Sequence, residues 1–321
     1  MLISKEMLFF RSVPAEIIQV NEKVTVDLFV KRKDKLVPYL PKNSTYTEVN
    51  FSEISHLGIR KFYVRGKDRQ HLERYMARYI DRILTNPEVP SKVKVNAFYV
   101  TSSQTMQQAF EDPRAEHLDN IKRSVKPMLK NIMKNESILK DLFSITQHDY
   151  YTYTHSVNVG IFATALAVRY YVDSGNKLDL NMEKLSYGYF LHDIGKSRIP
   201  LNILNKPGSL TEEEWVIMKM HPEWGYSILM ETGHLTDEAA YIALQHHEQI
   251  DGSGYPFAKK GSDIHPCARI CAIADTFDAL TSARPYKEAI GPYDALKLMQ
   301  KQSIYDFDYT LLTTFIRMLA P

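Results

Sequence analysis

Two short segments in the second half of the chain contain neighbouring residues that can bind metal ions. HDIGK places His192 next to Asp193, with Lys196 three residues later, and HHEQIDGSGYP begins with His246 and His247. Imidazole nitrogens and carboxylate oxygens bind divalent metal ions, and a lysine ammonium next to them can meet the charge of a phosphate. The two segments therefore predict a metal-dependent reaction centre with a cation beside it.

Other segments of the same half add further imidazole and carboxylate groups. The candidate ligand set consists of His155, His192, Asp193, His221, His246, His247 and Asp275. A single histidine in an apolar helix is more easily explained by packing, but the HD pair, the HH pair and a separate aspartate in successive helices are not. Ligands without thiolate favour iron, manganese or another divalent ion over a structural cysteine zinc site.

The size of this set predicts two metal ions. Successive helix positions point about 100° apart, so His246 and His247 serve one site only if that site is wide. Two ions roughly 3.5–4 Å apart, bridged by a carboxylate, would lower the pKa of a bridging water and hold hydroxide in line with an electrophile. Phosphorus is the favoured electrophile, because Lys196, Arg284 and Lys287 supply cations where phosphodiester charge would lie. The predicted chemistry is phosphoester hydrolysis.

Helices are predicted to position most of these side chains. Residues 150–171, which contain His155, are apolar nearly all round and predict a central helix. HDIGK ends the next helix, and Gly195 is predicted to be the residue that terminates it. A further helix begins after Pro266 and carries Asp275. The second half of the chain is therefore predicted to be a helical bundle.

Capping and proline signals set the limits of the remaining helices. Thr211 and Glu214 predict a capping box at a helix start. That helix is predicted to end near His221, because Pro222 disfavours a helical conformation in the residue before it. A helix that begins near Thr236 leads to the HH pair.

Asp278 follows Asp275 by three positions and so lies on the same face of its helix. Acidic side chains in an otherwise apolar helix are costly to bury unless they are paired or bind metal. We expect Asp278 to hydrogen-bond a metal ligand and orient it.

The first 65 or so residues predict a small α+β unit. The period-two alternation of Val24–Val30 and the segment Lys61–Val64 are typical of strands. A short helix between them is predicted to have Ser52 as its N-cap and Gly58 as its end, and Asp68 is predicted to cap the next helix.

The predicted fold class is mainly α, with a helical bundle preceded by a small α+β domain. We predict three parts: residues 1–88 as a regulatory or accessory α+β domain, 89–135 as a helical linker, and 136–321 as the catalytic domain. Pro87 and Pro90 indicate the first boundary.

Composition excludes several classes of protein. The chain has 321 residues, 44% of them apolar and 24% charged, and a formal net charge of +2, so no global basic field favours duplex nucleic acid or an anionic membrane. The only cysteines, Cys267 and Cys271, are expected to be buried thiols in a reducing compartment. The sequence shows neither a signal peptide nor a transmembrane run, and we expect a cytoplasmic protein.

The motifs resemble the HD-GYP branch of the HD phosphohydrolases. The resemblance covers about residues 150–289 and rests on HDIGK, HPEWG, HHEQIDGSGYP, ADTFDALTSARPY and Lys287, in that order. It implies an all-helical domain with two or three metal ions that hydrolyses cyclic di-GMP to pGpG, and in some members on to GMP. The α+β unit is similar to a small domain that precedes some HD-GYP proteins.

The resemblance also implies roles for individual residues. Asp193 would bridge the metal ions, and Lys196 would meet the scissile phosphate or the leaving oxygen. Tyr255, Arg284 and Lys287 would contact the nucleotide.

The resemblance bears on the number of metals. Members built for three metals carry a glutamate four residues before the first ligand histidine, where this chain has Tyr151, so two ions are predicted. Iron or manganese is favoured, with zinc, nickel, magnesium and calcium as alternatives.

Three other functions are compatible with the motifs. One is a receptor or adaptor that binds cyclic di-GMP, or a diguanylate cyclase (GGDEF) protein through the GYP surface, with little turnover. A second is hydrolysis of another cyclic dinucleotide such as cyclic GMP-AMP, and a third is a general HD nucleotide hydrolase. The sequence leaves the oligomeric state open, with a dimer as one option, and leaves open whether hydrolysis stops at pGpG.

Overall fold

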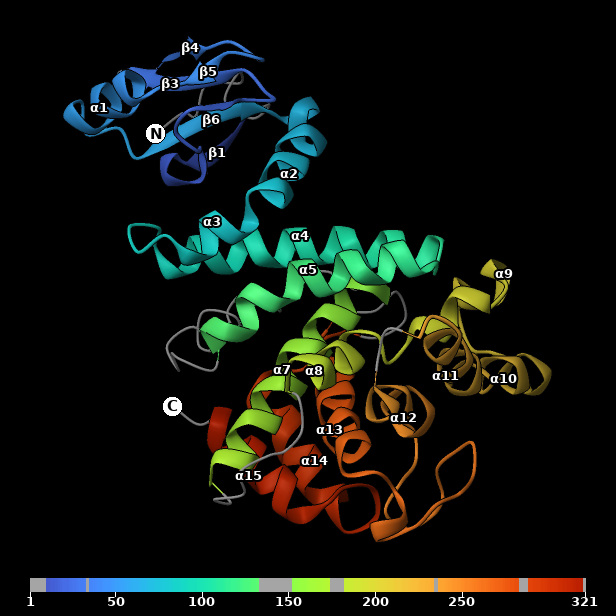
Figure 1. Ribbon diagram of the computed structural model, residues 1–321. Coiled ribbons are helices and arrows are strands. Elements are labelled where there is room, and N and C mark those ends of the chain that lie inside the picture. The colour runs from blue at the N-terminus through green and yellow to red at the C-terminus, as the bar shows by residue number, and fades with distance from the viewer. Residues whose placement is uncertain are drawn as a thin grey trace. The chain divides into compact units, whose positions relative to one another are not determined.

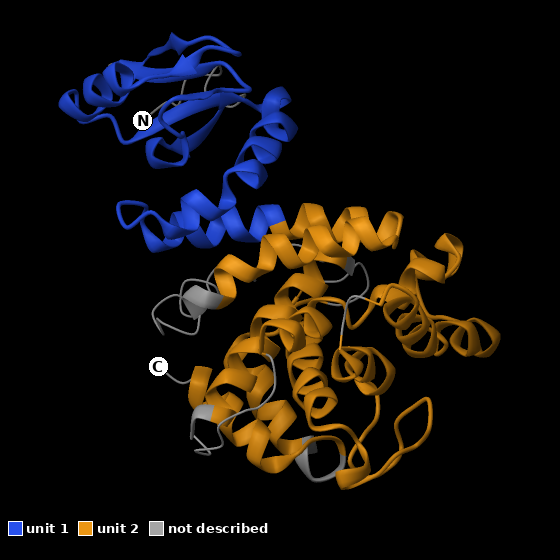
Figure 2. Cartoon of the chain, in the orientation of Figure 1, with its two compact units in different colours: residues 1–101 blue, residues 102–321 orange. Residues whose placement is uncertain are grey.

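A computed structural model describes residues 10–32, 35–132, 152–173, 182–233, 236–282 and 288–319 (Figure 1). The chain forms two compact units, residues 1–101 and residues 102–321, which are coloured separately in Figure 2. The division between them falls inside helix α4 (Ser91–Glu111). The predicted domain boundaries near residues 88 and 135 stay predictions.

The first unit is an antiparallel sheet with short helices. Its elements are β1 (Phe10–Pro14), η2 (Ala15–Ile17), β2 (Glu22–Lys23), β3 (Leu28–Arg32), β4 (Lys35–Leu40), β5 (Thr45–Tyr46), α1 (Glu48–His56), β6 (Lys61–Arg65), η3 (Gly66–Asp68), α2 (Arg69–Arg78) and α3 (Ile80–Thr85). Within the described residues, four strands pair in the order β1-β6-β3-β4, and β2 pairs with β5. Pro38 lies in the edge strand β4, where the missing N–H costs no ladder hydrogen bond.

The strand predictions for this unit are partly confirmed. β6 matches the predicted strand at Lys61–Val64, and the alternating apolar residues of Val24–Val30 are buried as expected. The strand itself begins only at Leu28, because the chain before it crosses to pair with β5.

Two helix predictions in this unit were wrong. Thr47, not Ser52, caps α1, since its hydroxyl accepts the Asn50 N–H and the Asn50 side chain accepts the Thr47 N–H. Asp68 is the N-cap residue of α2, as predicted, although its side chain makes no capping hydrogen bond, but the single helix expected after it is divided at Tyr79.

The second unit is helical. Besides the end of α4, it contains α5 (Ala115–Ile132), α7 (Thr152–Asp173), α8 (Met182–Phe190), η4 (Ile194–Arg198), α9 (Leu201–Leu204), α10 (Glu212–Met218), α11 (His221–Glu231), α12 (Asp237–Gln245), η5 (Gly261–Asp263), α13 (Pro266–Thr281), α14 (Pro292–Asp306) and α15 (Tyr309–Leu319). Helix α7 packs against α8, α13 and α15, and α12 packs against α8, α11 and α13 (Figure 1).

The core of this unit is centred on α7 and α13. Val159, Phe162 and Leu166 of α7 pack with Ile270 and Phe277 of α13 in one apolar cluster. Both helices are buried on most of their surface, as their nearly continuous apolar sequences predict. The two cysteines lie in this cluster, buried and free as expected. Such packing fixes the direction of polar side chains near the start of α7 and in the middle of α13.

Most of the predicted helix limits in this unit are confirmed. Thr211 and Glu214 form the predicted capping box of α10, and Thr236 is the N-cap of α12. The chain breaks between α10 and α11, and His221 is the first residue of α11, with Pro222 in its first turn. Proline is tolerated there because the N–H groups of the first turn have no partner within the helix. No helix among the described residues is long and apolar enough to cross a membrane.

Candidate metal centre

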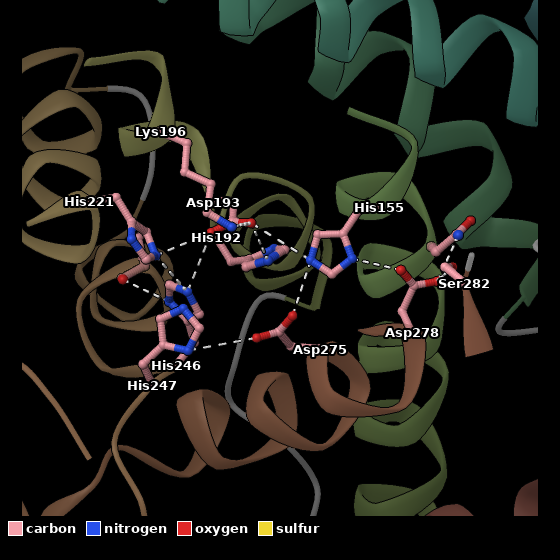
Figure 3. Close-up of polar contacts among 12 residues, drawn as sticks. His155, His192, Asp193, Lys196, His221, His246, His247, Asp275, Asp278 and Ser282 are labelled. Carbon is pink, nitrogen blue, oxygen red and sulfur yellow. Dashed lines mark hydrogen bonds and ion pairs between the residues drawn. The ribbon is translucent and has the colours of Figure 1, made fainter. Parts of the chain in front are cut away.

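The two carboxylate oxygens of Asp193 face two different groups of histidines. Oδ2 lies 3.4 Å from His192 Nε2 and 3.7 Å from His155 Nε2. Oδ1 lies 3.3 Å from His221 Nε2 and 3.6 Å from His246 Nε2. Figure 3 shows these imidazole rings around the carboxylate. Asp193 therefore has the geometry of a group shared between two neighbouring sites.

Backbone carbonyls hold three of these rings in one tautomer. The Nδ1 of His192 lies 2.9 Å from the Tyr189 carbonyl, that of His221 2.8 Å from Met218 O, and that of His246 2.8 Å from Ala243 O. A carbonyl only accepts, so each Nδ1 carries the hydrogen and each Nε2 keeps its lone pair. The Nε2 atoms of His221 and His246 face each other at 3.4 Å, so lone pairs converge on the same space.

His155 is held in the same tautomer by Asp278. Its Nδ1 donates to Asp278 Oδ2 at 2.6 Å, while Asp278 Oδ1 accepts from Asn158 Nδ2 at 2.7 Å and from Ser282 Oγ at 3.1 Å. Figure 3 shows His155 between Asp278 and Asp193. On the other side of the ring, His155 Nε2 lies 3.0 Å from Asp275 Oδ1. Asp278 thus contacts His155, and its role in orienting a metal ligand stays a prediction.

His247 and Asp275 form the accessible side of the cluster. His247 Nδ1 lies 3.8 Å from Asp275 Oδ2, and the two side chains are 25% and 15% exposed, whereas Asp193 is 1% exposed. Both line a cavity of about 730 Å³, which is within the usual size of a small-molecule site. The cluster is therefore closed on the bundle side and open toward this cavity.

The electrostatics of the cluster favour neutral imidazoles around ionised carboxylates. Burial lowers the pKa of His221 to about 4, and it also lowers the pKa of His192 and His247. Burial alone would raise the pKa of Asp193, but the Lys196 ammonium and the adjacent histidines hold it well below its usual range. Neutral imidazole and ionised carboxylate are the forms that bind metal.

Unsatisfied buried atoms show that these residues fit metal ions. Among the described residues, His192 Nε2 and Asp193 Oδ1 are buried without a partner in hydrogen-bond geometry, which is costly unless another group binds them. Ligand atoms of Asp193, His221, His246 and His247 lie within 4.8 Å of one another, and so do those of His155, His192 and Asp193. The cluster can hold metal ions in two groups that share Asp193.

Lys196 and Tyr255 each contact one member of the cluster. Lys196 Nζ is 2.5 Å from Asp193 Oδ2. The Tyr255 ring stacks on His247, with centroids 4.7 Å apart and planes 25° apart, and Tyr255 lines the cavity. Of the other predicted substrate contacts, Arg284 and Lys287 lie outside the described residues, as does Tyr151.

Glu248 fixes the loop that carries Tyr255. Its buried carboxylate accepts the backbone N–H of Phe257 at 2.8 Å and that of Lys259 at 2.9 Å. The Tyr255 N–H donates to the His247 carbonyl at 3.1 Å. Glu248 therefore supports the loop that follows the HH pair.

Gly195 was wrongly predicted to be a helix terminator. It lies in η4, and a Cβ added to it would overlap the His221 carbonyl oxygen and lie 2.5 Å from the Gly225 nitrogen. The backbone of HDIGK thus touches the first two turns of α11, which brings Asp193 to His221. This long-range contact has no signature in the local sequence.

The close approach at Gly195 predicts a large effect of a single methyl group. G195A should lower the free energy of unfolding by about 1–3 kcal/mol, because neither backbone can move without displacing the other. Thermal and urea unfolding would measure the change. G291A is the matched control, since the nearest atom to its added Cβ is 3.8 Å away. Equal stability of the two variants would contradict the packing role of Gly195.

Sequence reasoning missed several residues of the site. Trp215 of α10 and Lys219, the residue that ends this helix, line the cavity, and Asn158 and Ser282 support Asp278. The sequence offered a weak signal for Asn158, which lies three residues after His155 in an apolar helix. Trp215 is 46% exposed, so its role in the cavity wall depends on the tertiary structure.

The match to a family model completes the assignment of the fold. The HD domain model matches residues 138–311, more than half of the chain, so the chain belongs to the HD domain family. The structure of Bd1817, a HDG"Y"P protein from Bdellovibrio bacteriovorus, aligns with a TM-score of 0.65 at 19% identity, covering 97% of this chain and 99% of that chain. The predicted fold class, an HD-type bundle with a small α+β unit, is confirmed, as is the resemblance to the HD-GYP branch.

Two curated relatives carry names that state an activity. Cyclic di-GMP phosphodiesterase PA4108 from Pseudomonas aeruginosa is 32% identical over 228 residues, which are 71% of this chain and 52% of that protein. The 3'3'-cGAMP-specific phosphodiesterase 2 from Vibrio cholerae is 52% identical over 99 residues, which are 30% of this chain and 19% of that protein. The chain therefore matches about half, or less, of the length of these relatives.

Proposed function

We propose that this chain is a metal-dependent phosphodiesterase that hydrolyses cyclic di-GMP to pGpG. One observation carries the proposal: the two oxygens of Asp193 face two groups of imidazoles, at the side of a cavity large enough for a nucleotide. The name of the Pseudomonas aeruginosa relative supports the same substrate.

In this proposal the seven candidate ligand residues would hold two divalent ions, and Asp193 belongs to both groups of candidate ligands. Iron or manganese suits imidazole and carboxylate ligands, while zinc, nickel, magnesium and calcium are alternatives. When bound, such ions polarise a phosphoryl oxygen and acidify a water molecule. The chain itself contributes the fixed tautomers, the low pKa of Asp193 and a bundle that excludes bulk water on one side.

The proposed roles of the neighbouring side chains follow from their positions. Lys196, whose ammonium is 2.5 Å from Asp193, keeps that carboxylate ionised and supplies a positive charge for the scissile phosphate or the leaving oxygen. Tyr255 forms the cavity wall next to His247 and is the candidate contact to the nucleotide. Arg284 and Lys287 keep the same role as a proposal based on sequence.

A second candidate function is hydrolysis of 3'3'-cGAMP. The name of the Vibrio cholerae relative favours it, and that relative shares the higher identity over the segment it matches. The two substrates differ at one purine, so the metal centre alone does not distinguish them. A receptor with little turnover has no need for a complete ligand set and Lys196, which makes hydrolysis the better proposal.

The direct test uses full-length protein purified without oxygen. We expect two metal ions per chain by elemental analysis, and pGpG as the first product from cyclic di-GMP by chromatography. Cyclic di-GMP and 3'3'-cGAMP supplied together in one assay would rank the two substrates. Binding of cyclic di-GMP without product, in protein that contains iron or manganese, would contradict hydrolysis. Three ions per chain would contradict the two-metal prediction.

Two predictions about partners accompany the proposal. A diguanylate cyclase is proposed to bind at the surface of the loop that carries Tyr255, and a dimer is one option for the assembly.

A further inference from the structure

Helix α10 and the residue that ends it line the same cavity as the candidate metal ligands. His246, His247 and Asp275 line this cavity together with Trp215, Val216 and Lys219. The indole of Trp215 is 46% exposed and Val216 is 65% exposed. A large aromatic side chain left open to a cavity beside a candidate metal centre marks a surface that a ligand covers.

The local structure of α10 presents Trp215 in this position. The helix has seven residues, begins with the capping box of Thr211 and Glu214, and is tied to the preceding loop by the ion pair between Lys206 Nζ and Glu214 at 2.6 Å. No residue of α10 is buried. Burial of α10 in the core therefore does not explain its apolar residues.

A ring contact and a cation–π contact connect the end of α10 with the candidate metal ligand His247. His247 stacks on Tyr255, and the Lys219 ammonium lies 5.5 Å from the centroid of the same Tyr255 ring. Lys219 thus holds its charge over the aromatic wall at the edge of the cavity, where it can donate to a polar atom of a bound base.

We propose that Trp215 and Lys219 bind a purine base of the substrate. The indole supplies a flat apolar face on which the base stacks, and the Lys219 ammonium donates to the N7 or O6 acceptors of guanine. The inference rests on the proposed function, because it assigns the base-binding wall to the cavity in which hydrolysis occurs. Guanine, which offers both acceptors, fits the ammonium better than adenine, which offers N7 beside an amino donor.

This assignment predicts that Trp215 affects substrates that contain bases and leaves the chemistry intact. W215A should raise KM for cyclic di-GMP roughly 10-fold to 100-fold, the loss typical of one aromatic stacking partner, with little change in kcat. Hydrolysis of bis(p-nitrophenyl) phosphate, a phosphodiester without bases, should stay unchanged. W215F keeps a ring and should recover most of the affinity. K219Q should raise KM roughly threefold to tenfold through the lost charge.

Y309A is the matched control for removal of an exposed aromatic side chain. Tyr309 is 70% exposed at the start of α15 and is not among the residues that line the cavity. Its replacement should leave both substrates unaffected. An equal loss of both activities in W215A would show a structural role for Trp215 and overturn the proposal. An unchanged KM for cyclic di-GMP in W215A would overturn it as well.

Fluorescence gives a second readout that does not depend on hydrolysis. The chain contains two tryptophans, so W224F leaves Trp215 as the only indole. Mixing W224F holoenzyme with cyclic di-GMP in a stopped-flow instrument should quench its emission before the first turnover is complete. Unchanged emission at saturating nucleotide would overturn the base-binding role. Quenching by cyclic di-GMP without hydrolysis would instead support the role of Trp215 and contradict the proposed function, which separates the two failures.

Discussion

Replacing Asp193 by asparagine is expected to remove the bound metal and to lower the rate of cyclic di-GMP hydrolysis by at least about 1,000-fold. Each oxygen of the carboxylate faces two imidazole nitrogens, so one substitution weakens both groups of ligands. An amide keeps the shape of the side chain but replaces one oxygen with a hydrogen-bond donor. A Lewis acid is worth several kcal/mol of transition-state stabilisation, and about 4 kcal/mol corresponds to this factor.

The experiment compares D193N with wild type in metal content, hydrolysis and circular dichroism. D263N serves as the control, because Asp263 is an exposed aspartate of the same unit outside the cluster and the cavity. The helical signal should persist in D193N, since the substitution conserves volume. Wild-type hydrolysis by a D193N protein that still binds two ions would disprove the bridging role of Asp193.

The grouping of the candidate ligands was predictable because metal binding depends on residue type. Only a few types of side chain bind divalent ions. Burying several of them in successive apolar helices costs free energy, and a shared metal site explains how this cost is offset. All seven predicted residues lie in one cluster in the structure. The position of Asp278 was also predictable, because helical spacing places it on the face of Asp275, and its side chain contacts His155.

The features of the fold and of the candidate site that were not predictable depend on contacts between segments distant in the sequence. Gly195 fits a helix end by local rules. In the structure, however, the absence of a side chain at Gly195 allows HDIGK to approach α11 closely. Thr47 and Ser52 are equally good caps by composition, and only the strand pairing before α1 decides between them. The exposure of Trp215 likewise depends on how α10 is placed over the cavity. Local sequence patterns predict the type and spacing of residues in a helix or strand. These three features depend on contacts in the tertiary structure, so local patterns do not predict them.

The same network shows how the chain prepares a metal site before any ion binds. Four imidazoles are each fixed by a hydrogen bond from Nδ1, three to backbone carbonyls and one to Asp278. A backbone acceptor cannot be removed by mutation of a side chain. Asp278 is therefore the point at which the tautomer of a ligand can be changed by one substitution, without touching the ligand itself.

Replacing Asp278 by asparagine is expected to reverse the tautomer of His155 and to weaken metal binding about 10-fold to 100-fold. Asn158 and Ser282 both donate to the Oδ1 position, so the amide oxygen of the new side chain should occupy it. The amide nitrogen then faces His155 Nδ1, which must become an acceptor. The hydrogen moves to Nε2, 3.0 Å from Asp275 Oδ1, and the lone pair that would bind metal is lost.

The control for this prediction is S282A, which removes one donor to Asp278 but leaves its bond to His155. We expect S282A to retain metal affinity close to wild type, while D278N loses it with the helical fold intact. Isotope-edited NMR of the histidine side chains would show the hydrogen on Nε2 of His155 in D278N and on Nδ1 in S282A. A D278N protein with wild-type metal affinity would mean that the tautomer of His155 is set by some other contact, and that Asp278 serves only to fill the space beside α7.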